Sequence, residues 1–285
     1  MSYGIGTSPL RKEDWPLIRG EGTYVADFKR PDMVHAFVVR SPFAHARFTR
    51  IGKDDVLAAP GVIDVITAED LPERGRPIPT RMFHDEASTR FLQRPLADGV
   101  VRYSGEPVAV VVAETRYLAE DAAELVHVDY EPLDVVLDPD DALAPGAPLL
   151  QPDAGTNVAG QLVVEHGDVE GAFRSADLVV TEEFRIQRHA AVPLETRGLV
   201  AEYDAKAESV TVWGAAKIPH VNKAILLKLL GWTDESRVRM VELHVGGGFG
   251  ARGEFYPEDY LIPFAAIRVG RPVSWIEDRE ENLRA

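Results

Sequence analysis

The chain has 285 residues, of which 45% are hydrophobic and 27% charged, a composition typical of a globular protein large enough for two packed domains. Its 46 acidic residues outnumber the 31 basic ones, and the formal charge of −15 predicts repulsion from nucleic acids and anionic membranes, although a local basic pocket is compatible with it. The absence of cysteine excludes disulfides, cysteine zinc sites, thiolate nucleophiles and cysteine-ligated iron–sulfur clusters within the chain. Any such cluster must reside on a partner.

Residues 1–16 have no apolar core of the signal-peptide kind, and no window of the chain approaches the roughly 18 apolar residues that a membrane span requires. We therefore expect a cytoplasmic protein with no membrane association. A signal carried by a partner subunit could still export an assembled complex.

Residues 22–130 predict one compact α/β unit. Its strands are expected in three apolar runs rich in β-branched side chains, at 34–39, 62–66 and 107–113. Thr115 is expected to cap a helix that runs through Val126, and residues 128–130 return to a strand. Strand, helix and strand in this order predict a crossover unit. His45, in the turn after the first strand, could act in a site, but a structural histidine is the simpler interpretation.

Residues 131–162 are dominated by proline, aspartate, alanine and glycine, a composition that predicts an extended linker. Order is expected to resume with three further strands, at 178–186, 196–203 and 209–213. An amphipathic helix is then expected to end at the stop signal Gly231, with Ile225, Leu226 and Leu229 directed toward the core.

The C-terminal part of the sequence predicts a strand at 238–245, a glycine-rich run, and a helix that begins at Pro257 and ends at the cap Gly270. Pro263 predicts a kink or a break in this helix. Residues 273–276 predict a last strand, which is followed by charged residues and by no further element that could cover it. An uncovered strand indicates a partner chain.

The run VGGGFGAR at 245–252 is the strongest functional signal in the sequence. Glycines lack a Cβ, so their N–H groups can approach an anion closely, while Arg252 would supply charge and Phe249 an apolar wall. The run lacks the Lys-Ser/Thr ending of a mononucleotide loop and the spacing of a dinucleotide fingerprint, which disfavours an ATP or NAD site. Lys217 is expected just before a helix N-terminus, where a cation is unfavourable unless an anion is present, although an exposed lysine is the simpler interpretation.

Short motifs extend from residue 19 to the end of the chain: RGEGTY at 19–24, RSPFAHA at 40–46, APGV at 59–62, GEPVA at 105–109, AAELV at 122–126, VDYEPL at 128–133, PLETRG at 193–198, PH at 219–220, the glycine run, and GRPV at 270–273 with Trp275, Glu277 and Arg279. Together they resemble the molybdenum-binding subunit of the xanthine dehydrogenase and aldehyde oxidase family of molybdenum hydroxylases. Several of the single motifs are weak, but the set is highly specific.

The resemblance implies a mixed α/β (α+β) protein in which an a/b hammerhead domain precedes the first, incomplete part of a molybdopterin-binding domain. The implied N-terminal arm, hammerhead domain, linker and molybdopterin-binding portion occupy residues 1–18, 19–131, 132–161 and 162–285. In this family the Gly-Gly-Phe-Gly loop lies beside the molybdenum, and we favour a place for its aromatic residue on the substrate channel over packing in the core. The cofactor-binding residues implied for this chain are Lys217, Gly247, Gly248, Phe249, Gly250, Ala251 and Arg252.

The sequence departs from the family pattern at two positions and at its end. Lys217 stands where many members have a glutamine that contacts an oxygen ligand of the metal, so this role persists with a cation or is altered. Gly253 stands where purine-oxidising members place a glutamate, which disfavours xanthine as the substrate, and Glu254 is one position out of register. Members continue far past Ala285 and carry the general-base glutamate there, so we expect no catalytic residue and no metal ligand in this chain, which is a split-gene subunit or a fragment.

The implied function is that of an enzyme component that inserts a hydroxyl derived from water into an aldehyde or an N-heteroaromatic ring. Its cofactor would be molybdenum with molybdopterin, in the cytosine dinucleotide form. Its partners would be the polypeptide with the rest of the molybdopterin domain, a 2Fe–2S subunit and an FAD subunit. The alternative is a non-catalytic assembly or binding module of the same family, which the truncated ending and Lys217 favour and the intact glycine run opposes. A stand-alone nucleotide-binding enzyme is disfavoured.

Overall fold

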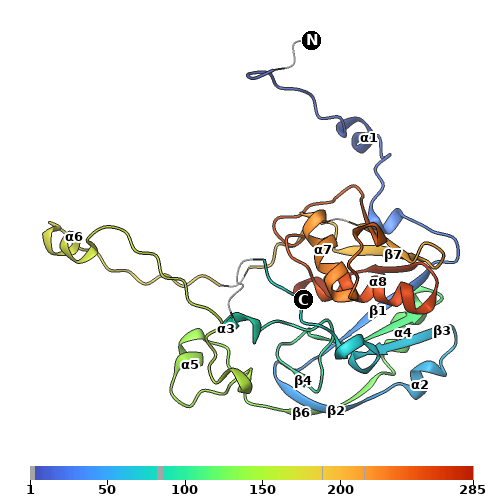
Figure 1. Ribbon diagram of the computed structural model, residues 1–285, viewed down its shortest axis with the longest axis horizontal. Helices are drawn as coiled ribbons and strands as arrows, with labels where there is room; N and C mark the ends of the chain where they lie inside the picture. The colour runs from blue at the N-terminus through green and yellow to red at the C-terminus, as the bar shows by residue number, and fades with distance from the viewer. Residues whose placement is uncertain (1–3, 82–85, 188, 215, 285) are drawn as a thin grey trace.

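The structure is a computed structural model that describes residues 4–81, 86–187, 189–214 and 216–284 (Figure 1). It is mixed α/β, as the sequence predicts, and contains a seven-stranded and a three-stranded sheet. In spatial order, the strands of the large sheet are β3 (Val62–Thr67), β5 (Pro107–Ala113), β1 (Val34–Arg40), β10 (Val273–Ile276), β7 (Gly198–Asp204), β8 (Ser209–Gly214) and β9 (Val238–Glu242). The small sheet contains β4 (Val100–Val101), β2 (Ala46–Gly52) and β6 (His127–Pro132).

The helices are mostly short, and the two longest come from the C-terminal half. They are α1 (Asp14–Ile18), α2 (Asp54–Leu57), α3 (Glu86–Thr89), α4 (Arg116–Ala123), α5 (Pro139–Leu143), α6 (Val169–Ser175), α7 (Pro219–Leu230), α8 (Pro257–Val269) and α9 (Arg279–Arg284). Single 3₁₀ turns lie at Val25–Asp27, Ala68–Asp70, Pro72–Arg74, Pro152–Ala154 and Glu235–Arg237. Within the described ranges, no helix combines the length and the apolar character needed to cross a lipid bilayer.

The large sheet is built from both halves of the chain. β1 and β10 meet at its centre and pair in parallel, with Val34 opposite Val273 and His35 opposite Ser274. The predicted strands at 34–39, 62–66 and 107–113 are confirmed, but they do not form a sheet by themselves. The two halves therefore share one sheet and one buried core, and this fixes their relative position.

Helices cover both faces of the large sheet around β5. The side chains of Val110 and Val112 belong to the cluster that also contains residues of α7 and α8, whereas Val111 packs in a second cluster with residues of α4. This alternation is expected, because successive side chains of a strand point to opposite faces. β10 lies between β1 and β7, and Trp275 is buried against the same cluster as α8. The prediction of an uncovered last strand is therefore wrong, because α8 folds back over it.

The predicted crossover unit is also wrong. Thr115 caps α4 by accepting a hydrogen bond from Leu118 N at 3.2 Å, as predicted, but the helix ends at Ala123 and not at Val126. The next strand, β6, joins the small sheet, where it runs antiparallel to β2. Both edges of β5 are occupied, by β1 and β3, so the large sheet offers β6 no place beside it. The structural interpretation of His45 is confirmed, because its buried ring lies 2.7 Å from the carbonyl oxygen of Asp134.

In the second half, the predictions of α7, β7, β8 and β10 are confirmed, and the structure differs from the predictions at three places. The helix α7 ends at Gly231, which has a φ of 72° as a C-terminal cap requires. The strand predicted at 238–245 ends at Glu242, because the chain leaves the sheet there. The predicted break at Pro263 is wrong: α8 runs through it, since burial of neighbours such as Leu261 and Ile262 offsets the hydrogen bond that proline cannot make.

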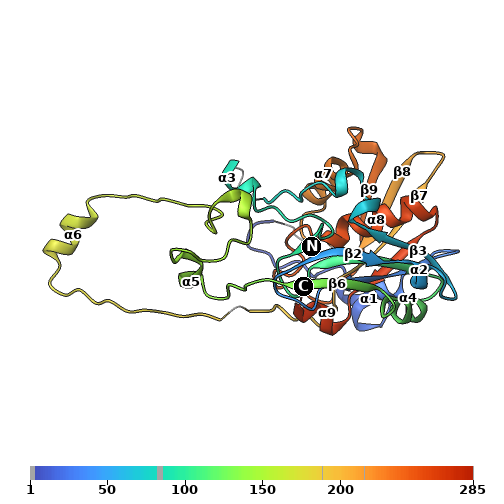
Figure 2. The same ribbon diagram turned by 90° about the horizontal axis from the view of Figure 1, so that it is seen from below.

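The third difference is the strand predicted at 178–186, which is not formed. Residues 158–192, which we call the arm, project away from both sheets and carry α6 at their far end (Figures 1 and 2). A β-strand needs a neighbour for its backbone hydrogen bonds. The described part of the arm lies next to no strand, so the sequence pattern remains without its partner.

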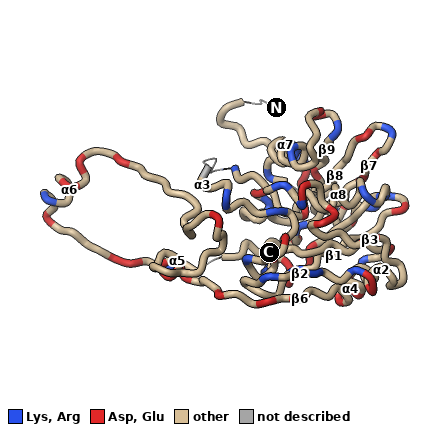
Figure 3. Tube along the Cα trace, turned by 60° about the horizontal axis from the view of Figure 1, so that its bottom comes forward, with Lys and Arg blue, Asp and Glu red and all other residues tan. Residues whose placement is uncertain are grey.

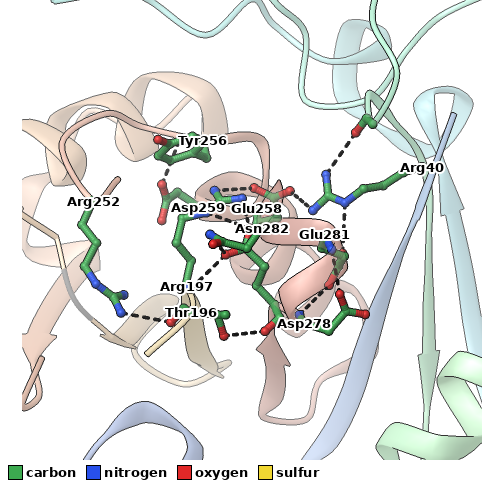
Figure 4. A network of polar contacts seen from close by, with 12 residues as sticks. Arg40, Thr196, Arg197, Arg252, Tyr256, Glu258, Asp259, Asp278, Glu281 and Asn282 are labelled. Atoms are coloured by element: carbon green, nitrogen blue, oxygen red, sulfur yellow. Dashed lines mark hydrogen bonds and ion pairs between the residues drawn. The ribbon is translucent and has the colours of Figure 1, made fainter. Parts of the chain in front are cut away.

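A network of buried charges joins the ends of the central strands (Figure 4). Arg197, at the start of β7, binds Glu258 of α8 at 3.1 Å and the carboxylate of Glu277, which follows β10. Arg40, at the end of β1, binds the same Glu258 at 2.7 Å and Glu281 of α9 at 3.0 Å. All five side chains are less than a tenth exposed. The charged residues expected to follow the last strand therefore turn inward and fix both halves of the chain to α8.

The two carboxyl groups that bind Arg40 respond in opposite ways to burial. Burial opposes the charge of Glu258, yet Arg197 and Arg40 together hold its pKa down, at about 2. Burial raises the pKa of Glu281 from 4.5 to about 7, although Arg40 acts in the other direction. The folded chain therefore binds the proton of Glu281 more tightly than the unfolded chain does.

We predict that Glu281 makes the free energy of unfolding fall as the pH rises from about 4.5 to 7, the window between its unfolded and folded pKa. The contribution is complete below this window and is lost above it. Replacing Glu281 by glutamine should reduce this fall in the free energy of unfolding by roughly 1–3 kcal/mol, since one pKa unit corresponds to about 1.4 kcal/mol. Urea unfolding of both proteins across this range measures it. The exposed neighbour Glu280→Gln is the control, and a slope that is equal in all three proteins contradicts the prediction.

Candidate functional site

The glycine run lies in the loop that connects the end of β9, in the large sheet, to the start of α8. The loop is fixed where it begins, because His244 N donates to the carbonyl of Thr23 at 3.0 Å and Thr23 N donates to His244 Nδ1 at 2.9 Å. Beyond this point the backbone takes positive φ at Gly247 (109°), Phe249 (47°) and Gly250 (99°). Positive φ is costly for a residue with a Cβ, so the conformation at Phe249 is strained.

The N–H groups of the loop are available for a ligand. In the part of the chain that the structure describes, the amides of residues 247–250 donate no hydrogen bond. A Cβ added at Gly248 would meet nothing within 4 Å. Consecutive free amides in a turn of alternating backbone conformation form a concave site for an anion. The run has the geometry that its glycines predict.

Glu195 holds this loop from the side, and the sequence interpretation gave it no role. Its carboxylate accepts a hydrogen bond from Gly246 N at 2.7 Å and from Arg252 Nη2 at 2.8 Å, and its amide donates to the carbonyl of Gly246 at 3.1 Å. Glu195 lies in the motif PLETRG, so the sequence marked its position. The contact to a loop 51 residues away could not be read from the sequence.

Arg252 points into the protein (Figure 4). Besides Glu195, its guanidinium group donates to the carbonyl oxygens of Gly247 at 2.9 Å and Thr196 at 3.0 Å, and its side chain is 5% exposed. These bonds close the loop onto the segment before β7. The charge of Arg252 is thus neutralised by Glu195, while the backbone of the loop faces outward.

A cavity of about 490 Å³ opens beside the loop. Phe249, Gly250 and Ala251 form one side of it, and Arg197 and Tyr256, whose ring centre lies 3.9 Å from that guanidinium carbon, form another. The remaining lining comes from the end of the arm, at 189–192, and from α9, at 282–284. Phe249 is 80% exposed, so its ring is not packed in the core of this chain. Its ring therefore belongs to the surface of the site.

Lys217 is joined to the loop through its main chain. Its amide donates to the carbonyl of Arg252 at 3.1 Å, two residues before α7 begins, and its side chain is exposed. The side chain is not part of the described lining of the cavity. The structure therefore brings Lys217 and the glycine run together, but it directs only the loop residues into the cavity.

The positions next to the loop bear on the substrate. A Cβ at Gly253 would lie 2.9 Å from the carbonyl oxygen of Gly250, so a side chain at this position would displace the loop. Glu254 is bound by Arg81, at 3.0 Å from Nε, and this ion pair lowers the pKa of Glu254. No group of three or more histidine, aspartate or glutamate side chains is arranged to hold a metal ion among the described residues.

Two family models match the chain in succession. The a/b hammerhead domain of aldehyde oxidase and xanthine dehydrogenase matches residues 19–134, and the molybdopterin cofactor-binding domain matches residues 150–285. The first contains β1 to β6, and the second contains the glycine run and the arm. These matches confirm the predicted fold, whereas the four boundaries given from the sequence stay predictions.

Three relatives illustrate the similarity. The large subunit of nicotine 6-hydroxylase from Paenarthrobacter nicotinovorans is 39% identical over 99% of this chain and 34% of its own length. The carbon monoxide dehydrogenase large chain of Hydrogenophaga pseudoflava is 41% identical over 98% of this chain and 36% of its own. The crystal structure of quinoline 2-oxidoreductase from Pseudomonas putida 86 superposes with a TM-score of 0.87 at 37% identity, and the match covers 98% of this chain and 35% of that one. The chain thus spans about a third of the length of these relatives.

We predict that Glu195→Gln loosens the glycine run. The glutamine keeps the shape but leaves the buried charge of Arg252 unpaired, and hydrogen bonds to charged groups contribute roughly 1.5–3 kcal/mol. The variant should unfold more easily by about this amount, and the amides of 246–252 should exchange hydrogen faster. Hydrogen exchange followed by mass spectrometry measures this. Glu165→Gln, on the exposed arm, is the matched control, and unchanged exchange in the loop of the Glu195 variant contradicts the proposed clamp.

Proposed function

This chain belongs to the xanthine dehydrogenase and aldehyde oxidase family, and we propose that it forms one wall of the molybdenum–molybdopterin site in the large subunit of a molybdenum hydroxylase. The observation that carries the proposal is the row of free amides at 247–250 beside a cavity of about 490 Å³. A row of N–H donors suits the anionic oxygen atoms of such a cofactor. The matched cofactor-binding domain supports the same assignment.

The residues of this chain would bind and orient the cofactor. Gly247, Gly248, Phe249 and Gly250 would donate their amides to it, and the ring of Phe249 would border the substrate channel. Ala251 lies on the same wall of the cavity. When bound, the molybdenum group supplies the oxygen-transfer and redox chemistry, and the protein supplies position and electrostatics. We expect the cytosine dinucleotide form of molybdopterin, as the resemblance implies.

Two cations support this wall in different ways. Arg252 would act through the loop, because its hydrogen bonds to Glu195 and Gly247 fix the direction of the amides. Lys217 is bound to Arg252 through its main chain, and its exposed side chain is not part of the described lining of the cavity, so a contact of its ammonium group with an oxygen ligand of the metal is what the resemblance alone implies. A preorganised loop of this kind needs no rearrangement when charge develops on the cofactor.

The remaining functions would come from the rest of the subunit and from partner chains. The general-base glutamate is expected in the part of the subunit that lies outside the matched third, and a 2Fe–2S subunit and an FAD subunit would accept the electrons. Relatives named for nicotine and quinoline favour an N-heteroaromatic ring as the substrate, with an aldehyde as the alternative. Purine-oxidising members of the family place a glutamate at the position of Gly253. A side chain there would displace the loop of this chain, which disfavours a purine as the substrate.

The test is to produce the chain together with its neighbouring genes and to measure molybdenum, iron and flavin in the complex. We predict that Gly248→Val lowers the molybdenum content about tenfold or more, since forcing a side chain into a filled space costs 1–3 kcal/mol or more. The variant should fold normally, because Gly248 has an ordinary φ and open space around its Cβ position. Gly4→Val, at a glycine with the same open surroundings, is the matched control.

Two outcomes would contradict the proposal. A Gly248→Val complex with full molybdenum content would show that the loop does not face the cofactor. A stable complex of the unaltered chain that contains no molybdenum would favour the non-catalytic assembly module.

A further inference from the structure

The arm exposes an unusual amount of apolar surface. Within residues 178–186, the side chains of Leu178, Val180, Phe184 and Ile186 are between 70% and 84% exposed. They occupy alternate positions, with Glu182 as the interruption, so an extended chain places them on one face. Such alternation is typical of a strand that is buried on one side. The chain is extended there (Figure 2) and has no neighbouring strand among the described residues.

The rest of the arm has the same character. At its far end, Val169 and Phe173 are 54% and 60% exposed and lie four residues apart in α6, so they share one face of the helix. On the outward leg, residues 162–164 add three exposed aliphatic side chains. Monomeric soluble proteins rarely expose apolar surface of this extent without a binding partner.

The charge of the arm restricts the partner. Six acidic side chains lie along residues 158–192, against three arginines. Figure 3 shows acidic residues on both legs of the arm. The surface that receives the arm should therefore be apolar at its centre and basic at its rim.

The position of the arm indicates what binds it. The arm lies inside the region matched by the molybdopterin cofactor-binding domain, which begins at residue 150, and the relatives are about three times as long as the matched part. Its last residues, 189–192, line the cavity beside Phe249. A polypeptide that binds the arm is thereby brought next to the cavity.

We propose that residues 178–186 add as a strand to an open sheet edge in the part of the molybdopterin-binding domain that the relatives carry beyond the matched third. The backbone hydrogen bonds of this strand would give affinity, and its apolar face would give register, as in other cases of strand addition. Docking would close the cavity and place that part of the domain beside the glycine run. The inference rests on the proposed function for the identity of the partner.

The experiment uses this chain and a separately produced polypeptide that corresponds to the remaining two thirds of the relatives. The double variant Phe184→Ser, Ile186→Ser should raise the dissociation constant about 30-fold or more, the change expected for residues at the centre of an interface. Arg185→Ser changes a side chain on the opposite face of the same strand and should alter the constant less than about 3-fold. All three chains should melt at the same temperature when alone, because the arm does not contribute to the buried clusters.

Hydrogen exchange gives a second measurement. The amides of 178–186 should exchange rapidly in the isolated chain and slowly in the complex. Equal exchange in both states, or equal affinity of the double variant, would overturn the inference. So would self-association of the isolated chain that the double variant abolishes, since this would assign the arm to a second copy. A complex with molybdenum but an unprotected arm refutes this inference alone, and a protected arm without molybdenum refutes the proposed function alone.

Discussion

Glu258 binds two arginines from opposite halves of the chain, and the position of the candidate site depends on this shared carboxylate. Arg40 fixes the end of β1 to it and Arg197 fixes the start of β7. Glu195 and Thr196 directly precede Arg197, and Glu195 holds the glycine run while Thr196 binds the carbonyl of Glu277. One short segment therefore joins the buried ion pairs to the loop. Breaking a buried pair by removing one partner typically costs about 3–5 kcal/mol, so this junction tolerates little change.

The site separates two uses of polar groups. The side chains of Arg252 and Glu195 are turned inward, and they fix the backbone of the loop. The groups that face outward are main-chain amides and an aromatic ring, on a backbone that takes positive φ at Gly247, Phe249 and Gly250. Strain of this kind persists where the surroundings hold it in place, and here Glu195 and Arg252 do so. The arrangement suits a large anionic cofactor better than a small ion that needs side-chain ligands.

The arm shows the limit of what this chain can bury by itself. The large sheet is covered on both faces around β5, whereas residues 178–186 have the composition of a strand without a neighbour. Without a neighbouring strand, the backbone N–H and C=O groups of an extended segment must form hydrogen bonds with water. Its exposed apolar side chains then contribute no burial free energy. The arm that carries this segment ends at the cavity, so a neighbour that pairs with the segment would also close the site.

The sequence by itself determined the local elements, the glycine run and the family resemblance. Periodic apolar runs at 34–39 and 107–113, and the stop signal Gly231, act over a few residues, and they were read correctly. The tertiary structure decided what each element pairs with: β6 leaves the large sheet, β10 lies at its centre, and α8 continues through Pro263. It also decided that Glu277 and Glu281 are buried and that Arg252 faces inward. These outcomes depend on which sheet edges are free and on arginines far away in the chain, and a local pattern carries no information on either.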